Sequence, residues 1–337
     1  MPTLQDIASL AGSSVQTVSA VMRGQDREKR ISSRRAAAIR AIAEQVGYRP
    51  NAAARATRLR RTDMVGVLIQ RAPGHLPTHN DSMSLVMGIN AGLEEQDKVM
   101  CLVRLHDVLS GGDDRLNSRV FREHVLDGMV IVNAVPDALN SRLQQLVPAC
   151  VWVDHNRFAE TCCVRRDEYA AGRTVVTQLA ARGYRRFLYV SYAVKWQEKH
   201  YSEVDRLRGV LDAAAELRLP CEQRGVPLNG PGTQPLPWLG ELTRDTAVIA
   251  YDAPAARSVL LCLACSPLTV GRDLGLACCD DAADLAHVAH VQFERSRIGR
   301  EAARMMAALL APVPAEPPSL QLSGAWVEGL TAPPVNP

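Results

Sequence analysis

The sequence lacks the signals that mark most enzymes and membrane proteins. It contains no GxSxG, HExxH or GxGxxG motif and no phosphate-binding P-loop, and its eight histidines are scattered. No apolar run is long enough to span a bilayer and no signal segment opens the chain, so we expect it to stay in the cytoplasm. These absences argue against an enzyme and against a membrane protein, and they predict no cofactor.

The nine cysteines lack the second ligand pair that a structural metal site needs. Cys262 and Cys265 have metal-like spacing, but no other Cys/His pair lies at zinc-finger distance. Disulfides are rare in a reducing cytoplasm, and free cysteine is among the most buried residue types. We therefore interpret the cysteines as core residues and expect no metal.

Charge is nearly balanced over the whole chain but is divided unevenly along it. Residues 1–62 hold 12 Arg/Lys and 4 Asp/Glu, a net charge of +8, whereas the rest of the chain has a net charge of −5. Such separation is typical of a small polyanion-binding head on an acidic globular body.

The head has the pattern of a helix-turn-helix. Thr3 and Asp6 predict a capped first helix, and Gly12 allows a sharp turn. Ser14 then caps a second helix with apolar residues at three- and four-residue spacing. In such a unit the second helix enters the major groove of DNA. An αα-hairpin that only packs has the same pattern, but the basic charge favours DNA binding.

The second helix is expected to expose its early residues to base edges. These residues are Val15, Gln16, Ser19 and Ala20. Glutamine can pair with adenine through two hydrogen bonds, and an apolar tip can contact a thymine methyl group. A third helix is expected to begin at Ile31–Ser32 and to end near Gln45, and a short helix capped by Asn51 follows Pro50.

From Met64 the pattern changes to short apolar runs that alternate with amphipathic segments. We expect strands at 64–69, 99–105, 128–132, 150–153, 187–191, 247–251, 274–278 and 288–292, and helices at about 83–96, 114–125, 168–183, 203–218, 253–265 and 296–310. This alternation predicts parallel sheets covered by helices, and its length fits two lobes better than one. Ligands of such sheets bind at the carboxyl ends of the strands, here the cleft between the lobes.

The chain resembles the LacI/GalR (lactose-repressor) family of bacterial transcription regulators in the runs TLQDIASLAGSSVQTVSAVMRG, ISSRRAAAIRAIAEQVGYRPNAAARATRLRRT and MVGVLI. The resemblance continues more weakly through VWVDHN, VRRDEYAAGRTVVTQLAARGYRRFLYVSY, AVIAYD and LGLACCDD. It implies an α/β protein with an N-terminal all-α helix-turn-helix head, a hinge helix, and a periplasmic-binding-protein-like two-lobe core with parallel sheets. By correspondence, the chain crosses between the lobes near 164–167, 290–294 and 319–322.

The resemblance divides the chain into five parts. They are a helix-turn-helix head (1–49), a hinge helix and linker (50–62), a core N-terminal lobe (63–164 plus 294–319), a core C-terminal lobe (165–293 plus 320–330) and a tail (331–337). The tail is Pro-rich and has no heptads, so we expect homodimers rather than tetramers.

Heads of this family bind double-stranded operator DNA as dimers. Carried over one by one, the DNA-contacting positions are Thr3, Ser14, Val15, Gln16, Thr17, Ser19, Ala20, Arg23, Arg34, Arg35, Tyr48, Asn51, Ala54, Arg55, Thr57 and Arg58. Two departures matter. Ala20 stands where the family often has Arg, and Thr57 stands where the hinge helix of the family has a Leu that wedges into the minor groove.

The resemblance also implies an effector site in the cleft. Arg206 matches an arginine that commonly fixes an effector hydroxyl or carboxylate, and Asp280 matches an acidic residue that accepts from effector hydroxyls. Tyr251 stands where the family generally has Asn and would offer an aromatic face instead. Asp81 and Ser82 lie where many members present aromatic rings to a sugar, which favours a hydrophilic or acidic effector.

These observations predict a sequence-specific, dimeric transcriptional regulator, a repressor, that a small polar effector such as a sugar or sugar acid controls through a population shift. Two alternatives stay open. One is a DNA-binding regulator whose cleft is vestigial or senses a protein partner or thiol state. The other is a carbohydrate- or nucleoside-processing enzyme with a nucleic-acid-binding head. We expect the protein to be cytoplasmic and associated with the nucleoid.

The substitution at Thr57 generates the first prediction. Inserting an apolar side chain unstacks a base step, at a cost of a few kcal/mol that extra contacts on bent DNA offset. Thr57→Leu should therefore increase both operator affinity and DNA bending, as measured by electrophoretic bend mapping. A large bend in the unaltered protein that Leu59→Ala abolishes would instead place the wedge two residues further along.

Overall fold

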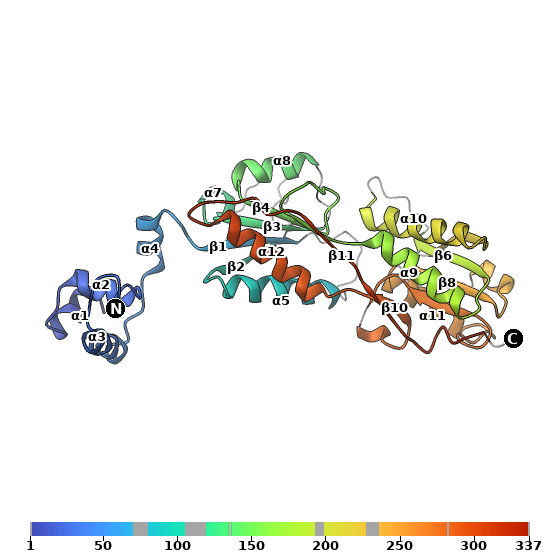
Figure 1. Ribbon diagram of the computed structural model, residues 1–337, viewed down its shortest axis with the longest axis horizontal. Helices are drawn as coiled ribbons and strands as arrows, with labels where there is room; N and C mark the ends of the chain where they lie inside the picture. The colour runs from blue at the N-terminus through green and yellow to red at the C-terminus, as the bar shows by residue number, and fades with distance from the viewer. Residues whose placement is uncertain are drawn as a thin grey trace. The chain divides into compact units, whose positions relative to one another are not determined.

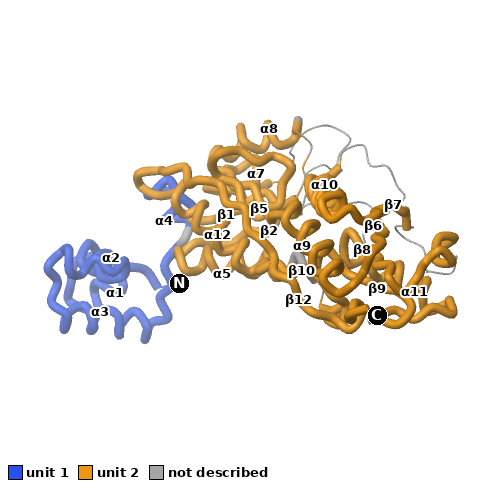
Figure 2. Tube along the Cα trace, turned by 45° about the vertical axis from the view of Figure 1, so that its right-hand side comes forward, with its two compact units in different colours: residues 1–62 blue, residues 63–337 orange. Residues whose placement is uncertain are grey.

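The computed structural model describes residues 2–69, 80–104, 119–133, 135, 137–192, 199–226, 236–281 and 283–335. The chain forms two compact units, residues 1–62 and residues 63–337 (Figure 2). Along the described residues, no helix combines the length and the apolar character needed to cross a bilayer.

Unit 1 consists of helices. Three of them, α1 (Leu4–Leu10), α2 (Val15–Met22) and α3 (Ser33–Gln45), surround a small core, and α4 (Ala52–Leu59) follows. The expected caps are confirmed: Thr3 and Asp6 form a reciprocal capping box, and Ser14 accepts a hydrogen bond from the backbone of Thr17. These caps provide hydrogen-bond acceptors for backbone N–H groups that have no partner within the first turn of a helix.

Unit 2 contains two six-stranded sheets, one in each lobe (Figure 1). The first sheet has the order β11-β5-β4-β3-β1-β2, with all neighbours parallel. Its strands are β1 (Met64–Ile69), β2 (Val99–Arg104), β3 (Gly128–Val132), β4 (Cys150–Val153), β5 (Cys163–Arg166) and β11 (Leu320–Leu322). Helices α5 (Asn80–Glu94), α7 (Arg119–Arg122), α8 (Asp137–Leu146) and α12 (Arg295–Leu309) complete the first lobe.

The second sheet has the order β12-β10-β9-β8-β6-β7. Its strands are β6 (Arg186–Tyr192), β7 (Cys221–Val226), β8 (Thr246–Ala250), β9 (Gly275–Cys278), β10 (Ala289–Gln292) and β12 (Ala325–Val327), and only β12 runs antiparallel to its neighbour. Helices α9 (Glu168–Ala181), α10 (Tyr201–Glu216) and α11 (Ala253–Ala264) cover it, with short 3-10 turns at Pro237–Glu241 and Ala283–Leu285.

Each sheet is buried on both faces, as expected for parallel strands between helices. On β3, Met129 and Ile131 pack in the cluster that contains α8, whereas Val130 and Val132 pack in the cluster that contains α5 and α12. In the second lobe, α11 covers one face and the pair α9 and α10 covers the other. The two-lobe parallel α/β architecture is therefore confirmed.

The structure corrects several expected boundaries. Strands β5, β7, β11 and β12 were not predicted, because they are short or rich in polar residues and show no clear period. Helix α8 was also missed, although Leu139, Leu143 and Leu146 have helical spacing. Of the helix expected at 114–125, only α7 lies in the described residues. Because β11 still belongs to the first sheet, the third crossing follows Leu322 instead of lying at 319–322.

The segment expected to be a free tail is attached to the second lobe. The Thr331 hydroxyl donates to Leu276 O at 2.7 Å and accepts from Ala289 N at 3.0 Å. Val335 N donates to Arg182 O at 2.7 Å. These bonds attach residues 331–335 to strands β9 and β10 and to the end of α9, so the boundary at 331 was wrong.

The core interpretation of the cysteines is confirmed for six of them and wrong for Cys265, whose side chain is exposed at the end of α11. The buried residues are Cys150, Cys162, Cys163, Cys262, Cys278 and Cys279. Within the described ranges, no group of three His, Cys, Asp or Glu side chains is arranged to hold a metal ion.

Glycines set the closest helix contacts in both lobes. A Cβ at Gly299 of α12 would overlap Leu85 O of α5, and a Cβ at Gly172 of α9 would overlap Arg206 O of α10. Since α12 begins at Arg295, the crossing at Gly299 also fixes the start of this helix beside the second crossing between lobes.

Gly299→Ala should therefore force α12 away from α5 and destabilise unit 2 by about 1–3 kcal/mol, as overpacking does in close-packed interiors. Urea unfolding followed by tryptophan fluorescence measures this effect, since all four tryptophans lie outside the head. Gly240→Ala is the matched control, because a Cβ there meets no heavy atom within 4 Å. Equal midpoints for the two variants would contradict the role of the crossing.

Candidate functional sites

The start of α2 presents one side chain well suited to reading bases. Gln16 is exposed, while Val15 packs partly against the head core. The hydroxyl groups of Ser14 and Thr17 lie 2.8 Å apart and are used in the helix cap. Gln16 is therefore the residue of this turn whose polar end is directed to solvent and available to a base edge.

The expectation that Ala20 is exposed was wrong. Only 4% of Ala20 is accessible, and the chain folds back over it, with Gln25 N donating to Ala20 O at 2.9 Å. The turn that ends α2 thus covers this position. Ser19 lies beside it with its carbonyl accepting from Arg23 Nε at 2.9 Å.

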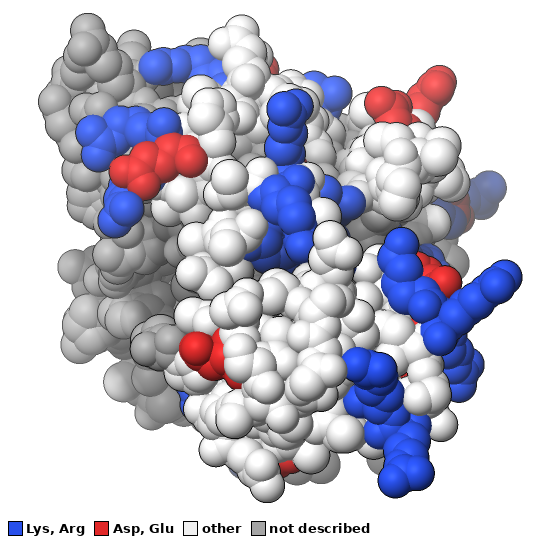
Figure 3. Space-filling model, turned by 90° about the vertical axis from the view of Figure 1, so that its left-hand side faces the viewer, with Lys and Arg blue, Asp and Glu red and all other residues white. Residues whose placement is uncertain are grey.

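The predicted phosphate-contacting arginines of α3 differ in their surroundings. Arg35 Nη2 donates to Gly12 O at 3.1 Å and to Ser13 Oγ at 3.4 Å, so this side chain also holds the turn between α1 and α2. Arg34 is exposed. Figure 3 shows several separate groups of basic side chains among uncharged ones, and fewer acidic side chains. Such a surface favours binding to a polyanion.

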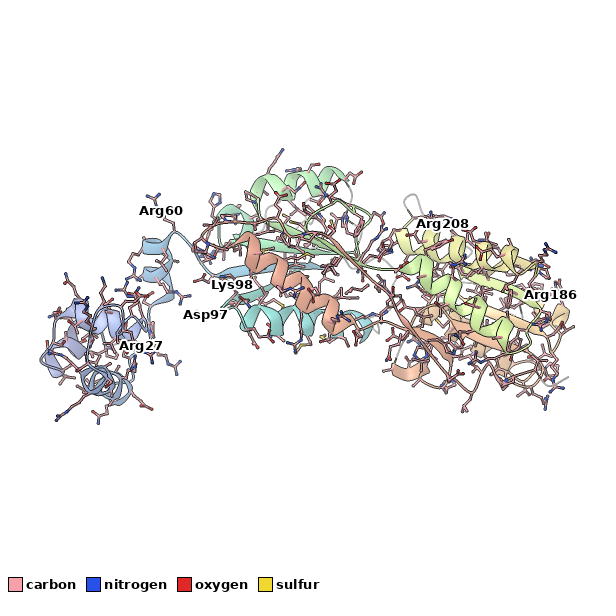
Figure 4. All side chains as sticks on the ribbon, in the orientation of Figure 1. Arg27, Arg60, Asp97, Lys98, Arg186 and Arg208 are labelled. Carbon is pink, nitrogen blue, oxygen red and sulfur yellow. The ribbon has the colours of Figure 1, made fainter. Side chains whose placement is uncertain are left out.

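The hinge segment forms the expected helix. Asn51 Oδ1 accepts from Ala54 N at 3.2 Å, and Arg60, in the left-handed region with φ 51°, ends α4 and extends from it (Figure 4). The Thr57 hydroxyl donates to Ala53 O at 3.0 Å and is bound to its own helix. Leu59 is 50% exposed. Four other predicted DNA contacts of the head and hinge are exposed: Thr3, Ala54, Arg55 and Arg58. Tyr48 packs partly against the head core.

A group of buried and partly buried charged residues joins the two lobes. We call it the interlobe charge cluster, and it consists of Asp154, Arg166, Glu168, Arg206, Asp280, Asp281 and Arg295. Asp154, Arg166 and Arg295 come from the ends of β4 and β5 and the start of α12, all in the first lobe. The remaining four come from α9, α10 and the end of β9, in the second lobe.

Arg206 is at the centre of this cluster and is 1% exposed. Its Nε and Nη2 donate to the two carboxylate oxygens of Glu168 at 2.5 and 2.8 Å. Nη2 also donates to Asp280 Oδ2 at 2.9 Å, and Nη1 donates to Tyr251 O at 2.6 Å. The structure therefore brings Arg206, Tyr251 and Asp280 together as predicted, but adds Glu168, which the sequence analysis missed.

The contacts between lobes run through two arginines. Arg166 Nη1 lies 3.1 Å from Asp280 Oδ2, and its Nη2 lies 3.2 Å from Glu168 Oε1. Arg295 forms ion pairs with Asp280 and Asp281. These links lie at the first and second crossings, so any change in the relative position of the lobes must alter them.

A second set of contacts lies beside the cluster. Asp154 accepts from Arg166 Nε at 3.1 Å and from the Tyr201 hydroxyl at 2.9 Å. His200 Nε2 lies 2.7 Å from Asp154 O. Tyr201 and His200 belong to the second lobe, so these bonds also tie the end of β4 to the start of α10.

The cluster changes the pKa values of its acids in different directions. Burial would raise the pKa of Asp280, but Arg295, Arg206 and Arg166 together hold it well below its usual range. For Glu168, burial outweighs the neighbouring Arg166 and Arg206, so its pKa is raised.

The other predicted effector residues are placed differently from expectation. Tyr251 is 8% exposed, its hydroxyl lies 2.7 Å from Ser202 Oγ, and the Arg206 guanidinium lies 4.9 Å from its ring centre. The expectation that it offers an open aromatic face was wrong, because neighbours cover the ring. Asp81 and Ser82 fall in the first turn of α5, and their side chains lie outside the described residues.

A hollow of about 740 Å³ adjoins the cluster. Its described lining comes from both lobes and from the second crossing: Ser84, Asp281, Ala283, Ala286, His290, Gln292, Phe293, Glu294, Arg295, Ser296, Arg297, Arg300 and Val327. Arg295 and Asp281 belong to both the hollow and the cluster. Ser84 and Arg295 were not predicted, and no signal in the single sequence distinguishes them from other helix-surface residues.

Comparisons with known proteins agree with this geometry. Residues 3–51 match the family model for bacterial regulatory proteins of the lacI family, and residues 176–331 match that for the periplasmic binding protein-like domain. The HTH-type transcriptional regulator GalR of Salmonella typhimurium is 27% identical over 77% of this chain and 74% of its own. The HTH-type transcriptional regulator CelR of Thermobifida fusca is 25% identical over 95% of each chain.

Two solved structures share the fold. The lac repressor dimer bound to operator and the anti-inducer ONPF has a TM-score of 0.75 and 18% identity, over 98% of this chain and 99% of that one. The complex of the transcriptional regulator CelR with cellobiose has a TM-score of 0.64 and 21% identity, over 98% of this chain and 100% of that one.

Two histidines beside the cluster, His155 (buried) and His200 (partly buried), predict a loss of stability in acid. Burial lowers the pKa of His155 and of His200 from 6.5 to about 4, so the folded protein holds both rings neutral while the unfolded chain protonates them. Their contribution is present above pH 6.5 and is lost as pH falls towards 4, with a limiting slope of about 1.4 kcal/mol per pH unit for each ring.

Urea unfolding of unit 2, followed by tryptophan fluorescence at pH 7 and pH 5, should show this loss. His200→Asn should reduce the difference between the two pH values. An unchanged difference in the variant would show that other groups cause the acid sensitivity.

Proposed function

The chain belongs to the LacI family of bacterial regulatory proteins and is a DNA-binding transcriptional regulator rather than an enzyme, and from this premise we propose that it is a repressor controlled by a small polar effector. The observation that carries the proposal is the charge cluster at the crossings between lobes, beside a hollow lined by both lobes. A molecule bound there contacts residues that must move together with the lobes. We propose that the protein acts on the nucleoid in the cytoplasm.

Operator recognition is assigned to the head and hinge. We propose the predicted positions as DNA contacts, Ala20 excepted, with Gln16 reading a base and the exposed arginines contacting phosphates. The division into head, hinge and two lobes is also retained, with residues 320–322 moved into the first lobe and residues 331–335 added to the second.

We propose a homodimer as the DNA-binding form. Large apolar side chains are exposed on α5 and on the edge strand β2: Met83 (59%), Met87 (56%), Val99 (57%) and Leu102 (53%). Exposed apolar surface beside a sheet edge is typical of an interface between chains. Two heads held together in this way would read two half-sites of one operator.

The effector site is proposed at the hollow and the adjoining cluster. Asp81 and Ser82 lie on the helix turn that precedes Ser84. Arg295 lines the hollow and pairs with Asp280, which in turn accepts from Arg206. Tyr251 O accepts from Arg206 as well. The polar lining suits a sugar, a sugar acid or a similar molecule. Coupling to the head would then depend on how the effector shifts the balance between lobe arrangements.

One observation favours a second function, a regulator whose cleft binds no small molecule. The charged groups of the cluster are already paired with one another, as Arg206 shows. Calorimetry with a panel of sugars, sugar acids and nucleobases separates the two functions, because an unused cleft gives no heat with any of them.

The test of DNA recognition uses two variants on a set of operator sequences. Gln16→Ala should cost about 1–3 kcal/mol and relax the preference at one base position, because a side chain that reaches a base edge carries specificity. Arg34→Ala should weaken binding to all sequences about equally and reduce its dependence on salt. Affinities at several salt concentrations measure both effects. Equal losses across operators for Gln16→Ala would show that α2 does not read this sequence.

A further inference from the structure

Glu168 has the position of a bound carboxylate ligand. Its two oxygens receive parallel hydrogen bonds from Arg206 at 2.5 and 2.8 Å, and Arg166 lies 3.2 Å from the same group. The side chain of Glu168 is 0% exposed. Two parallel N–H···O bonds from a guanidinium are the geometry by which proteins recognise small carboxylates.

Arg206 has little capacity left for another partner. A guanidinium has five N–H donors, and the bonds to Glu168, Asp280 and Tyr251 O use four of them. A neutral effector cannot replace Glu168 here, because its hydroxyls would leave the charges of Arg166 and Arg206 without enough negative partners in a buried place. A carboxylate from another molecule can replace Glu168, because it supplies the negative charge that the two guanidiniums need.

Glu168 also completes the link between lobes. It begins α9 of the second lobe, whereas Arg166 ends β5 of the first. The cluster contains three arginines and four carboxylates, and Arg166 and Arg206 share two of these acids, Glu168 and Asp280. Without Glu168, Arg206 would keep Asp280 as its one acidic partner among those of the cluster, and Arg166 would keep Asp154 and Asp280, while Arg295 already shares Asp280.

We propose that Glu168 is an internal carboxylate ligand of Arg166 and Arg206, which holds the two lobes together with no effector bound. Resting on the proposed function, the same geometry names the class of effector: a molecule that contacts Arg206 does so through a carboxylate that replaces the one of Glu168. Neutral sugars then do not bind at Arg206.

The experiment removes this carboxylate and supplies a small one from solution. Full-length Glu168→Ala should melt at a lower temperature than the unaltered protein. Sodium acetate or formate should raise its Tm by about 2–4 °C in a saturable way, relative to sodium chloride at equal ionic strength. The unaltered protein should show no such difference between salts, because its site is filled.

Glu216→Ala is the matched control. Glu216 forms the same paired contact with Arg173, at 2.8 and 2.6 Å, but its side chain is 61% exposed. This variant should lose little stability, since exposed ion pairs contribute little, and should not respond to acetate. An equal acetate response in both alanine variants, or none in Glu168→Ala, would overturn the proposal.

Two further measurements keep the test decisive. If Glu168→Ala does not fold, Glu168→Gln keeps the volume and removes the charge. It should melt below the unaltered protein and show no acetate response because the amide fills the site; an unchanged Tm would contradict the proposal.

Operator binding of the unaltered protein is measured in parallel. If acetate does not raise the Tm of Glu168→Ala while the unaltered protein binds its operator, the role of Glu168 is refuted and the proposed function is not. If the unaltered protein shows no specific DNA binding, the proposed function is refuted.

Discussion

The pairing of buried charges at the lobe crossings is the constraint on which the core depends. Three guanidiniums cannot be taken out of water unless carboxylates meet them at hydrogen-bonding distance, and here those carboxylates come from both lobes. The lobes therefore cannot separate at this point without exposing or unpairing charge. A ligand-controlled regulator needs such a property, because a ligand shifts the balance between two conformations only if its contacts differ in free energy between them.

The helix crossings serve the same arrangement. Gly299 lets α12 approach α5 closely, and Gly172 lets α9 approach α10. The contact between α12 and α5 sets the position of Arg295, and the contact between α9 and α10 sets Arg206 opposite Glu168. The same close backbone contacts at Gly299 and Gly172 thus determine both how the helices pack and where the charged side chains of the cluster lie.

How much could be predicted from the sequence depended on how local the signal was. The caps at Thr3, Ser14 and Asn51 and strands such as β1, β3 and β4 follow from neighbouring residues, and the structure has them where expected. Burial of Ala20 was missed because a later turn covers it. Glu168 was missed for a related reason: a glutamate in the first turn of a helix is ordinary in sequence, and Arg206, which holds both of its oxygens, lies 38 residues away in α10. Resemblance located Arg206 and Asp280 but could not show that the chain supplies its own partner for them.

The exchange of segments between lobes has a consequence for synthesis. Helix α12 and strand β11 belong to the first lobe, although the chain makes them after almost all of the second. Strand β12 and the attached residues 331–335 then complete the second lobe. On the ribosome, neither lobe can close its hydrophobic core until the last part of the chain has emerged, so both must wait as incomplete intermediates. The head, whose buried core residues lie between Ile7 and Ala43, is complete long before. A ribosome that stops early therefore releases a folded DNA-binding head without the lobes that would regulate it.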